Sequence, residues 1–163
     1  MIKKFALIVF CMIVCSSCQR NDQLVYTNYQ ETTGYWHKDS IQEFHFSPND
    51  TLGAYNLIVY TRNDQSYPFN NLLLITKMEF PSGRIIADTL EYNMAYPDGR
   101  MLGQGNNMKE NRLLFKENVT FFEEGNYRFS IQHAMRKAEE IEGVKKLKGV
   151  YNIGIEIERN SPE

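Results

Sequence analysis

The sequence predicts an all-β protein: a single antiparallel β-sandwich of about eight strands, with at most one short helix. Two observations carry this prediction. Short segments in which apolar and polar residues alternate follow one another along the chain, separated by clusters of Gly, Pro, Asn, Asp and Ser. Long helical segments do not stand between them, which disfavours a parallel α/β fold. The length of 163 residues is typical of one domain.

The first clear strands are expected at residues 41–46 and 55–62. In the first of them, Phe44 and Phe46 share one face and a Ser-Pro-Asn-Asp turn follows. The second is rich in β-branched and aromatic residues and ends in an Asn-Asp turn. Residues 24–29 are a further candidate for an edge strand within an otherwise polar segment.

A β-hairpin is the clearest local prediction. Its strands are expected at residues 71–80 and 85–92, and the Pro-Ser-Gly turn at 81–83 is of a kind that joins antiparallel neighbours. The apolar residues that share one face are Leu72, Leu74, Met78 and Phe80 in the first strand, and Ile86, Leu90 and Tyr92 in the second.

The second half of the chain has the same character. After a loop at 97–109, strands are expected at 113–116, 119–122, 127–133 and 150–159. Residues 134–141 are good helix formers over about two turns, which predicts a short helix or a helical loop. In the last strand one face is expected to be apolar and the other to lie in water, because Tyr151, Ile153, Ile155 and Ile157 alternate with Asn152, Gly154, Glu156 and Glu158.

The N-terminus has the features of a bacterial signal peptide. Lys3 and Lys4 precede an unbroken apolar run at residues 5–14. A helix of this length extends about 15 Å, which is half of a bilayer core, so the run does not span a membrane. Small residues at 15–17 then lead into Cys18, and this pattern resembles the bacterial lipobox.

The lipobox resemblance implies that Cys18 becomes the first mature residue and carries a diacylglycerol and an N-acyl chain. We therefore expect a lipoprotein signal peptide at 1–17, a lipidated N-terminus and tether at 18–30, and the β-sandwich domain at 31–163. Several acyl chains on one residue give stable anchoring, so the protein would meet the membrane through this anchor. The alternative is a plain secreted protein whose signal is removed without lipidation.

Cysteine content and charge exclude other classes. All three cysteines lie within the first eighteen residues, so the mature chain keeps Cys18 alone and has no intramolecular disulfide. Removal of Lys3 and Lys4 with the signal peptide changes the net charge from −2 to −4. A mildly acidic domain is not a nucleic-acid protein held by a basic face.

No motif for catalysis or metal binding stands out. The histidines, His37, His45 and His133, are far apart in the sequence and are expected at the surface or rim. The chain has neither a G-x-S-x-G elbow nor a Walker loop, and Gly103-Gln-Gly105 is interpreted as loop backbone with positive φ. We therefore expect no catalytic residue, no metal, and no cofactor beyond the covalent lipid.

Two aromatic segments, 35–37 and 67–71, lie outside the clearest strands and suggest binding. Loop aromatics of a sandwich can form a platform for a protein or a sugar. We expect two segments to contact a partner. One is the loop at 97–107, and the other consists of Tyr67, Pro68, Phe69, Asn70 and Asn71. The carbohydrate alternative requires an exposed strip of Trp36 with Tyr35 or Tyr67, whereas the preferred interpretation is that Trp36 closes an open end of the sandwich.

Several motifs, taken together and in order, resemble the gliding-motility lipoprotein GldH family of the Bacteroidota. Besides Cys18, they are Tyr67-Pro-Phe-Asn-Asn-Leu72, Asp88-Thr-Leu-Glu-Tyr92, Gly99-Arg-Met-Leu-Gly-Gln-Gly105, Gly125-Asn-Tyr127, Gln132-His-Ala-Met-Arg136, Leu147-Lys-Gly-Val150 and Gly154-Ile-Glu-Ile157. The set covers nearly the whole mature chain. Met101 departs from the expected pattern, in which an aromatic residue precedes Leu-Gly.

The resemblance implies a non-enzymatic, lipid-anchored outer-membrane protein of the gliding machinery, which is linked to type IX secretion. Its implied partners are other envelope or gliding and secretion proteins. The short segment after Cys18 lacks a clear acidic cluster of the sort that suggests surface export in these bacteria, which favours the periplasmic face. A carbohydrate-binding envelope lipoprotein that uses exposed aromatics is the alternative function.

Overall fold

Ten β-strands make up the regular structure of the computed structural model, which describes residues 23–137 and 140–160. Within these ranges no helix is present, and so none is long and apolar enough to cross a membrane. The strands are β1 (Leu24–Glu31), β2 (Tyr35–His37), β3 (Gln42–Phe46), β4 (Ala54–Asp64), β5 (Asn71–Glu79), β6 (Ile85–Asn93), β7 (Met108–Thr120), β8 (Tyr127–His133), β9 (Lys146–Lys148) and β10 (Val150–Arg159).

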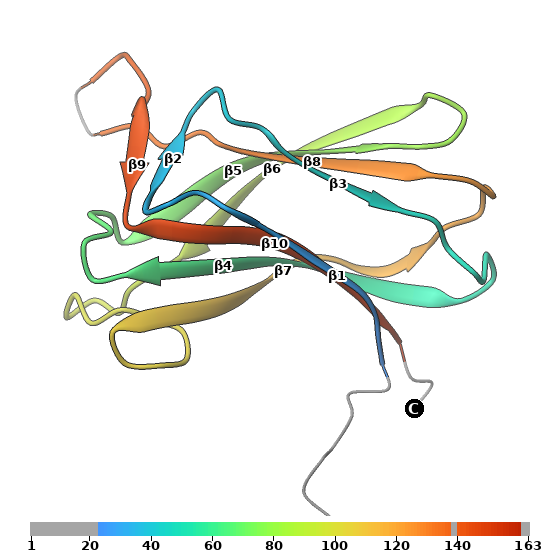
Figure 1. The fold of residues 1–163 in the computed structure, drawn as a ribbon, viewed down its shortest axis with the longest axis horizontal. Helices are drawn as coiled ribbons and strands as arrows, with labels where there is room; N and C mark the ends of the chain where they lie inside the picture. Colours follow the sequence, from blue (N-terminus) through green and yellow to red (C-terminus); the bar gives the residue numbers. More distant parts are fainter. Residues whose placement is uncertain (1–22, 138–139, 161–163) are drawn as a thin grey trace, which may run out of the picture.

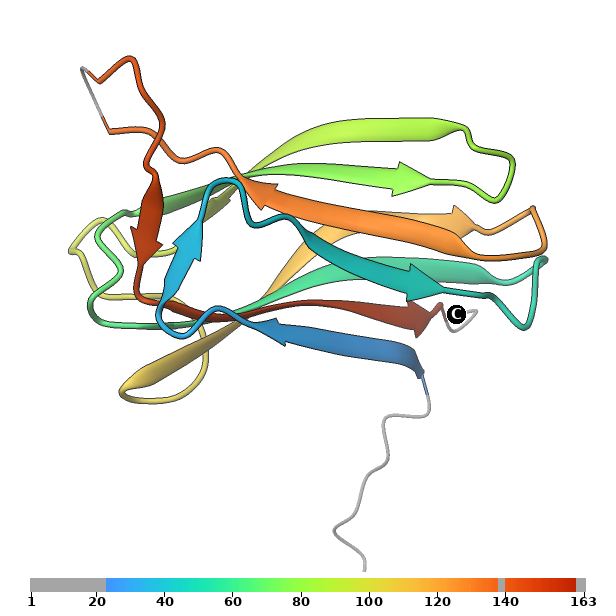
Figure 2. The ribbon, with the colours of Figure 1, turned by 45° about the horizontal axis from the view of Figure 1, so that its top comes forward.

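Two four-stranded antiparallel sheets pack face to face (Figure 1). One has the order β1-β10-β4-β7 and the other has the order β3-β8-β5-β6 (Figure 2). The all-β sandwich expected from the sequence is therefore confirmed. Every neighbouring pair of strands is antiparallel, as short turns between strands require.

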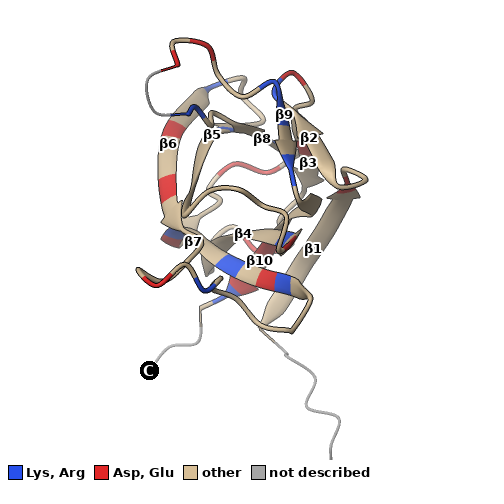
Figure 3. Ribbon diagram, turned by 90° about the vertical axis from the view of Figure 1, so that its left-hand side faces the viewer, with Lys and Arg blue, Asp and Glu red and all other residues tan. Residues whose placement is uncertain are grey.

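A third, two-stranded sheet of β2 and β9 joins the two layers at one end (Figure 3). The chain crosses from β1 to β3 through β2, and it returns from β8 to β10 through β9. Trp36 and Leu147 are register partners in this small sheet and both are fully buried. The crossing strands therefore close the core at this end, which is the role preferred for Trp36.

The core between the sheets is rich in aromatic rings. Phe121 lies at its centre, with its ring centroid 4.8 Å from that of Tyr127 and 5.1 Å from that of Phe46. Tyr55 and Phe129 complete this group of rings. Tilted and edge-on contacts of this kind stabilise a core beyond the area that they bury.

The predicted hairpin and the facing pattern of the first strands are confirmed. β5 and β6 pair from Asn71–Asn93 to Glu79–Ile85 without a register shift. Phe44 and Phe46 are buried and His45 is exposed, as the alternation of β3 predicts.

The sequence-based strand list needs three corrections. Residues 24–31 form β1, so the sandwich begins inside the segment that we assigned to the tether. The short strands β2 and β9 were not expected. β7 is one continuous strand instead of two pieces, because its register shifts opposite Tyr55–Ile58 absorb the irregularity near Asn118, whose φ is 54°.

The expected helix at 134–141 is wrong in the part that the structure describes. Arg136 forms an isolated bridge with Gly143, and the Val144 amide donates to the Met135 carbonyl oxygen, so this segment is an irregular hairpin between β8 and β9. Met135 is buried but Ile141 is almost fully exposed. A helix here would have no apolar face to pack, so its intrinsic propensity is overridden.

The alternation in β10 also differs from the prediction. A register shift between Val150 and Asn152 moves Tyr151 to the outside, while Val150 is buried. The face expected to lie in water is partly covered, because Glu156 is buried and Tyr29 packs over Gly154.

Candidate functional site

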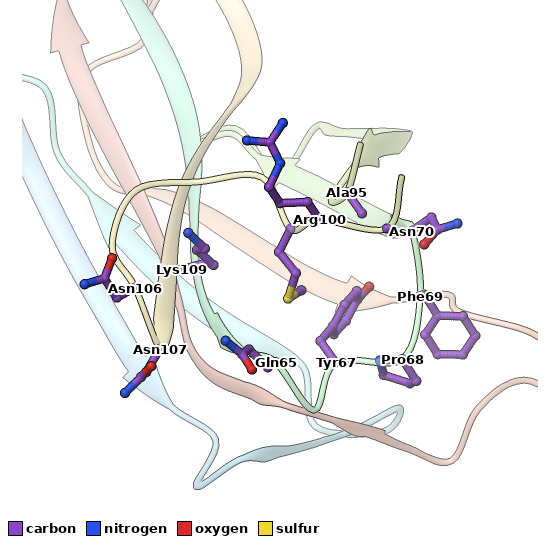
Figure 4. Close-up of a pocket in the computed structure, with 12 residues that line it drawn as sticks. Gln65, Tyr67, Pro68, Phe69, Asn70, Ala95, Arg100, Asn106, Asn107 and Lys109 are labelled. Carbon is purple, nitrogen blue, oxygen red and sulfur yellow. The ribbon is translucent and has the colours of Figure 1, made fainter. Parts of the chain in front are cut away.

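A cavity of about 600 Å³ lies at the end of the sandwich that β2 and β9 close, and Figure 4 draws the residues that line it. Three segments build it: the β4–β5 loop, the first part of the β6–β7 connection, and the last part of that connection with the start of β7. Its lining residues are Gln65, Tyr67, Pro68, Phe69, Asn70, Ala95, Gly99, Arg100, Met101, Asn106, Asn107 and Lys109.

Tyr67 forms a rigid wall of the cavity. Its side chain is only 6% exposed, and its hydroxyl donates to the Asn71 carbonyl oxygen at 2.7 Å. The Phe69 ring stands edge-on to it with centroids 6.0 Å apart. Burial raises the pKa of Tyr67 far above its ordinary value, so the phenol stays neutral and acts as a donor.

Asp64 holds the loop that carries Tyr67. Its Oδ1 accepts from the Ser66 amide at 2.8 Å and from the Ser66 hydroxyl at 2.6 Å, and its Oδ2 accepts from the Tyr151 hydroxyl at 3.1 Å. Desolvation raises the pKa of Asp64, but these hydrogen bonds outweigh it and hold the pKa below its usual value. The loop therefore leaves β4 in a fixed Asx turn.

The opposite wall depends on two glycines. Gly103 and Gly105 both have positive φ, near 95°, as expected for this G-x-G segment. A Cβ at Gly103 would lie 2.6 Å from Asn111 Oδ1, and one at Gly105 would lie 2.3 Å from the Met108 carbonyl oxygen. The chain therefore turns back tightly at these glycines. As a result, Asn106 and Asn107, at the end of the β6–β7 connection, lie beside the β4–β5 loop.

The cavity lining combines two cations with four side-chain amides and contains no carboxylate. Arg100 stacks on Tyr96 with the guanidinium carbon 4.5 Å from the ring centroid, and its Nε lies 3.8 Å from the carboxylate of Asp98, which is exposed and stands outside the lining. Lys109 donates to the Gly105 carbonyl oxygen. The amides belong to Gln65, Asn70, Asn106 and Asn107. Such a lining supplies hydrogen bonds and positive charge, which suits a ligand that carries carboxylate groups.

The structure brings together most of the residues that the sequence singled out. Pro68 and Asn70 are exposed at the cavity mouth, and Phe69 is half-buried. Asn71 is not part of the lining: its side-chain amide donates to Glu91 at 2.6 Å within the β5–β6 hairpin. Tyr67, expected as an exposed contact, is a buried wall because Gly149 allows the chain to press against it.

Sequence reasoning missed Gln65, Ala95 and Lys109, which belong to the ends of other elements. No local pattern marks them, because they meet only when the two loops fold toward each other. Cys18, the expected lipidation site, lies outside the described residues.

The exposed aromatic strip required by a carbohydrate-binding surface is not formed. Trp36 is fully buried and its indole N–H donates to the Ser40 carbonyl oxygen at 2.8 Å. Only Tyr35 of the three residues proposed for that strip is exposed.

His133 contradicts its predicted place at the surface. It is 3% exposed, its ring lies edge-on to Trp36, and its Nε2 lies 3.1 Å from the Trp36 carbonyl oxygen. Since a carbonyl only accepts, Nε2 carries the proton, and Nδ1 has no hydrogen-bond partner among the residues that the structure describes. Burial lowers the pKa of this histidine.

A second polar cluster covers the outer face of the sheet that contains β10. Glu156 is buried there and accepts from the Tyr29 hydroxyl at 2.6 Å and from Arg112 Nε at 2.7 Å. The Tyr60 ring lies 4.6 Å from that of Tyr29, and burial together with Glu110 raises the pKa of Tyr60 to about 12. These hydrogen bonds join residues on different strands of the same sheet, so the cluster stabilises the sheet.

The fold and the cavity define a class: a β-sandwich domain whose loops at one end line a polar cavity with two cationic side chains. The family model described as GldH lipoprotein matches residues 24–157. The chain belongs to the GldH lipoprotein family, as its ordered motifs suggested.

Two curated relatives support this assignment. The "Gliding motility lipoprotein GldH homolog" of Christiangramia forsetii is 42% identical over 153 residues, which cover 93% of each chain. The "Gliding motility lipoprotein GldH" of Flavobacterium johnsoniae is 40% identical over 159 residues, covering 97% of this chain and 98% of that one. Both matches span nearly the full length of the two proteins.

A solved structure of infectious bursal disease virus is also similar, with a TM-score of 0.32 and 10% identity. The match covers 84% of this chain and 32% of the viral one. A likeness of this size carries no argument about function.

Proposed function

We propose that this chain is a lipid-anchored envelope protein of the gliding motility machinery, linked to type IX secretion, which acts by binding another envelope protein. Two observations support the proposal. The relatives named above are gliding motility lipoproteins, and Cys18 follows a lipobox-like sequence. In this proposal Cys18 carries the diacylglycerol and the N-acyl chain at the periplasmic face of the outer membrane.

The observation that carries the mechanism is the position of the cavity. The chain enters the sandwich at Leu24, at the end opposite to the cavity loops (Figure 1). β4 runs between the two ends, and its eleven residues extend about 36 Å at the usual rise of a strand. A protein anchored at Cys18 would therefore hold its cavity away from the membrane and toward a partner.

The lining favours an acidic polypeptide segment as the occupant. Arg100 and Lys109 offer the charge, and the neighbouring amides donate to carbonyl or carboxylate oxygens. Partner binding of this kind requires no catalytic group.

The test is a chromosomal replacement in the source organism. Arg100→Glu with Lys109→Glu reverses both cavity charges, and Lys137→Glu with Lys145→Glu is the control, because it reverses two exposed charges outside the cavity lining. We expect the cavity variant to lose colony spreading and type IX export, and the control to keep both. A photocrosslinker placed at position 106 in the cavity lining should capture a partner in the control but not in the cavity variant. Normal spreading and export after deletion of the gene would contradict the assignment to the machinery. Equal behaviour of the two variants would contradict the role of the cavity.

A further inference from the structure

We propose that the end of the sandwich beside the N-terminal tether is a membrane-contacting rim. Its residues are Leu52, Ile85 and Phe122, which we call the anchor rim. The inference rests on the proposed lipid attachment at Cys18. It adds a second, non-covalent contact between the folded domain and the lipid surface.

Each rim residue exposes apolar surface on a separate turn or strand end. Leu52 is 92% exposed in the β3–β4 loop, Phe122 is 58% exposed after β7, and Ile85 is 57% exposed at the start of β6. These turns all lie at the end of the sandwich where β1 begins and β10 ends (Figure 2).

The loop that carries Leu52 is joined to the start of the described chain. Asp50 Oδ1 accepts from the Leu52 amide at 2.9 Å and from the Gly53 amide at 3.1 Å, which forms an Asx turn with Leu52 near its tip. Asp50 Oδ2 accepts from Arg159 at 2.6 Å, and the Arg159 amide donates to the Gln23 carbonyl oxygen at 2.7 Å. Leu52 is therefore held beside the point where the tether enters.

The turns that carry Phe122 and Ile85 form one unit. The Phe122 ring lies 5.6 Å from that of Phe80, and Arg84 lies over both rings. Glu123 accepts from the Ser82 amide at 2.9 Å, which joins the β5–β6 turn to the β7–β8 turn. The second of these turns is in turn linked to β3, because Asn126 and His45 lie 3.0 Å apart.

Tether length identifies the occupant as the bilayer. The five residues from Cys18 to Asp22 reach at most about 18 Å, since an extended chain covers at most 3.3–3.6 Å per residue. That is about half of the distance along β4, so an acylated Cys18 keeps this end, and not the cavity end, next to the lipid. Exposed Ile141 and Tyr35 belong to the segments at the far end and are not part of the rim.

The charges at this end favour a zwitterionic surface. Asp50, Glu123 and the exposed Glu124 lie there with Arg84 and Arg159, so these residues do not form a basic patch that would attract anionic lipid. Apolar side chains at an interface add binding by burying surface, and they do not require anionic lipid.

The experiment uses the full, processed lipoprotein in vesicles of phosphatidylcholine and phosphatidylethanolamine. Since Cys18 is acylated, Leu52→Cys or Phe122→Cys provides a single free thiol for an environment-sensitive fluorophore. Asn106→Cys in the cavity loop is the matched control. We expect labels at 52 and 122 to shift to shorter emission wavelengths and to lose most of their intensity to spin-labelled lipids, and the label at 106 to do neither.

Three outcomes overturn the inference, and they separate it from the proposed function. An acylated protein whose labels at 52 and 122 are as water-exposed as the label at 106 overturns the rim alone. Labels that are shielded in native envelopes but not in pure vesicles indicate a protein occupant and also overturn it. Absence of the acyl groups by mass spectrometry removes the anchor and overturns both proposals. Thermal unfolding of each variant verifies that the fold is intact.

Discussion

Gly149 and Tyr67 touch backbone to backbone at the cavity end of the sandwich. Gly149 has a φ of 82°, and a Cβ added to it would lie 2.4 Å from the Tyr67 nitrogen and 2.7 Å from its Cα. The Gly149 carbonyl oxygen accepts from the Asp64 amide, and the Gly149 amide donates to the Gly34 carbonyl oxygen. The turn between β9 and β10 therefore fixes the loop that forms one wall of the cavity.

Gly149→Ala is expected to destabilise the domain more than a positive φ alone explains. A left-handed backbone costs an alanine about 1–2 kcal/mol, and the clash with Tyr67 adds to this. Gly83→Ala is the control, because Gly83 has the same φ with nothing within 4 Å of the added Cβ. Urea unfolding gives both free energies, and equal losses would contradict the proposed close contact.

Removal of Arg112 is expected to leave Glu156 poorly compensated. In Arg112→Met the buried carboxylate keeps the Tyr29 hydroxyl but loses the donor at 2.7 Å, at a cost of about 1–3 kcal/mol. The double variant Arg112→Met with Glu156→Gln removes the charge as well and should be more stable than Arg112→Met alone. If the double variant is less stable than Arg112→Met, the uncompensated charge of Glu156 is not the reason why the single variant is destabilised.

Acidification below the ordinary pKa of histidine is expected to weaken the fold through His133. Burial lowers its pKa, the Trp36 carbonyl opposes that shift, and His37 adds to it. The unfolded chain therefore binds a proton first, so stability falls as the pH falls below about 6.5 toward the folded-state pKa. Melting temperatures of the wild type and of His133→Gln between pH 7.5 and pH 5, a range that brackets that ordinary value, test this. Parallel curves would count against His133 as the source.

The free energy of unfolding is expected to fall at high pH, because the buried phenols of Tyr60 and Tyr92 stabilise the fold only while they are protonated. Burial raises the pKa of Tyr60, with Glu110 contributing, and that of Tyr92, each to about 12. Because these folded-state values lie above the ordinary value, their stabilisation is complete below about pH 10 and is lost as the pH rises through 12. Phenolate absorbance should show delayed ionisation, and Tyr60→Phe with Tyr92→Phe should reduce that delayed fraction by two tyrosines, while Tyr67 remains in it. Ionisation of all tyrosines near the ordinary value would disprove this.

The sequence was sufficient where structure is local. The β5–β6 hairpin follows from its alternation and its Pro-Ser-Gly turn, and Phe44 and Phe46 face the core as their spacing requires. The strands β2 and β9 could not be found this way, because each has three residues and its partner lies far away in the chain. Tyr151 was placed on the wrong face because a bulge changes the phase of β10, and no single-strand pattern reveals a bulge.

The cavity was predictable only in part for a related reason. The segment at 67–71 and the loop at 97–107 were recognised from their aromatic and Gly-Asn content. Lys109 and Gln65 could not be recognised, because they are ordinary polar residues at strand ends and only the fold brings them to the cavity. His133 is the opposite case: its polar character suggested the surface, whereas Trp36 encloses it.

The pairing of β1 with β10 determines how the domain responds to tension. The pairs run antiparallel from Leu24–Glu158 to Glu31–Asn152, and β1 begins at the end of the sandwich opposite to the cavity (Figure 1). Because ladder hydrogen bonds lie perpendicular to the strands, a pull between the two ends loads them together in shear. The domain should therefore be mechanically stiff along its long axis, and a force across the sheet should unzip β1 one pair at a time.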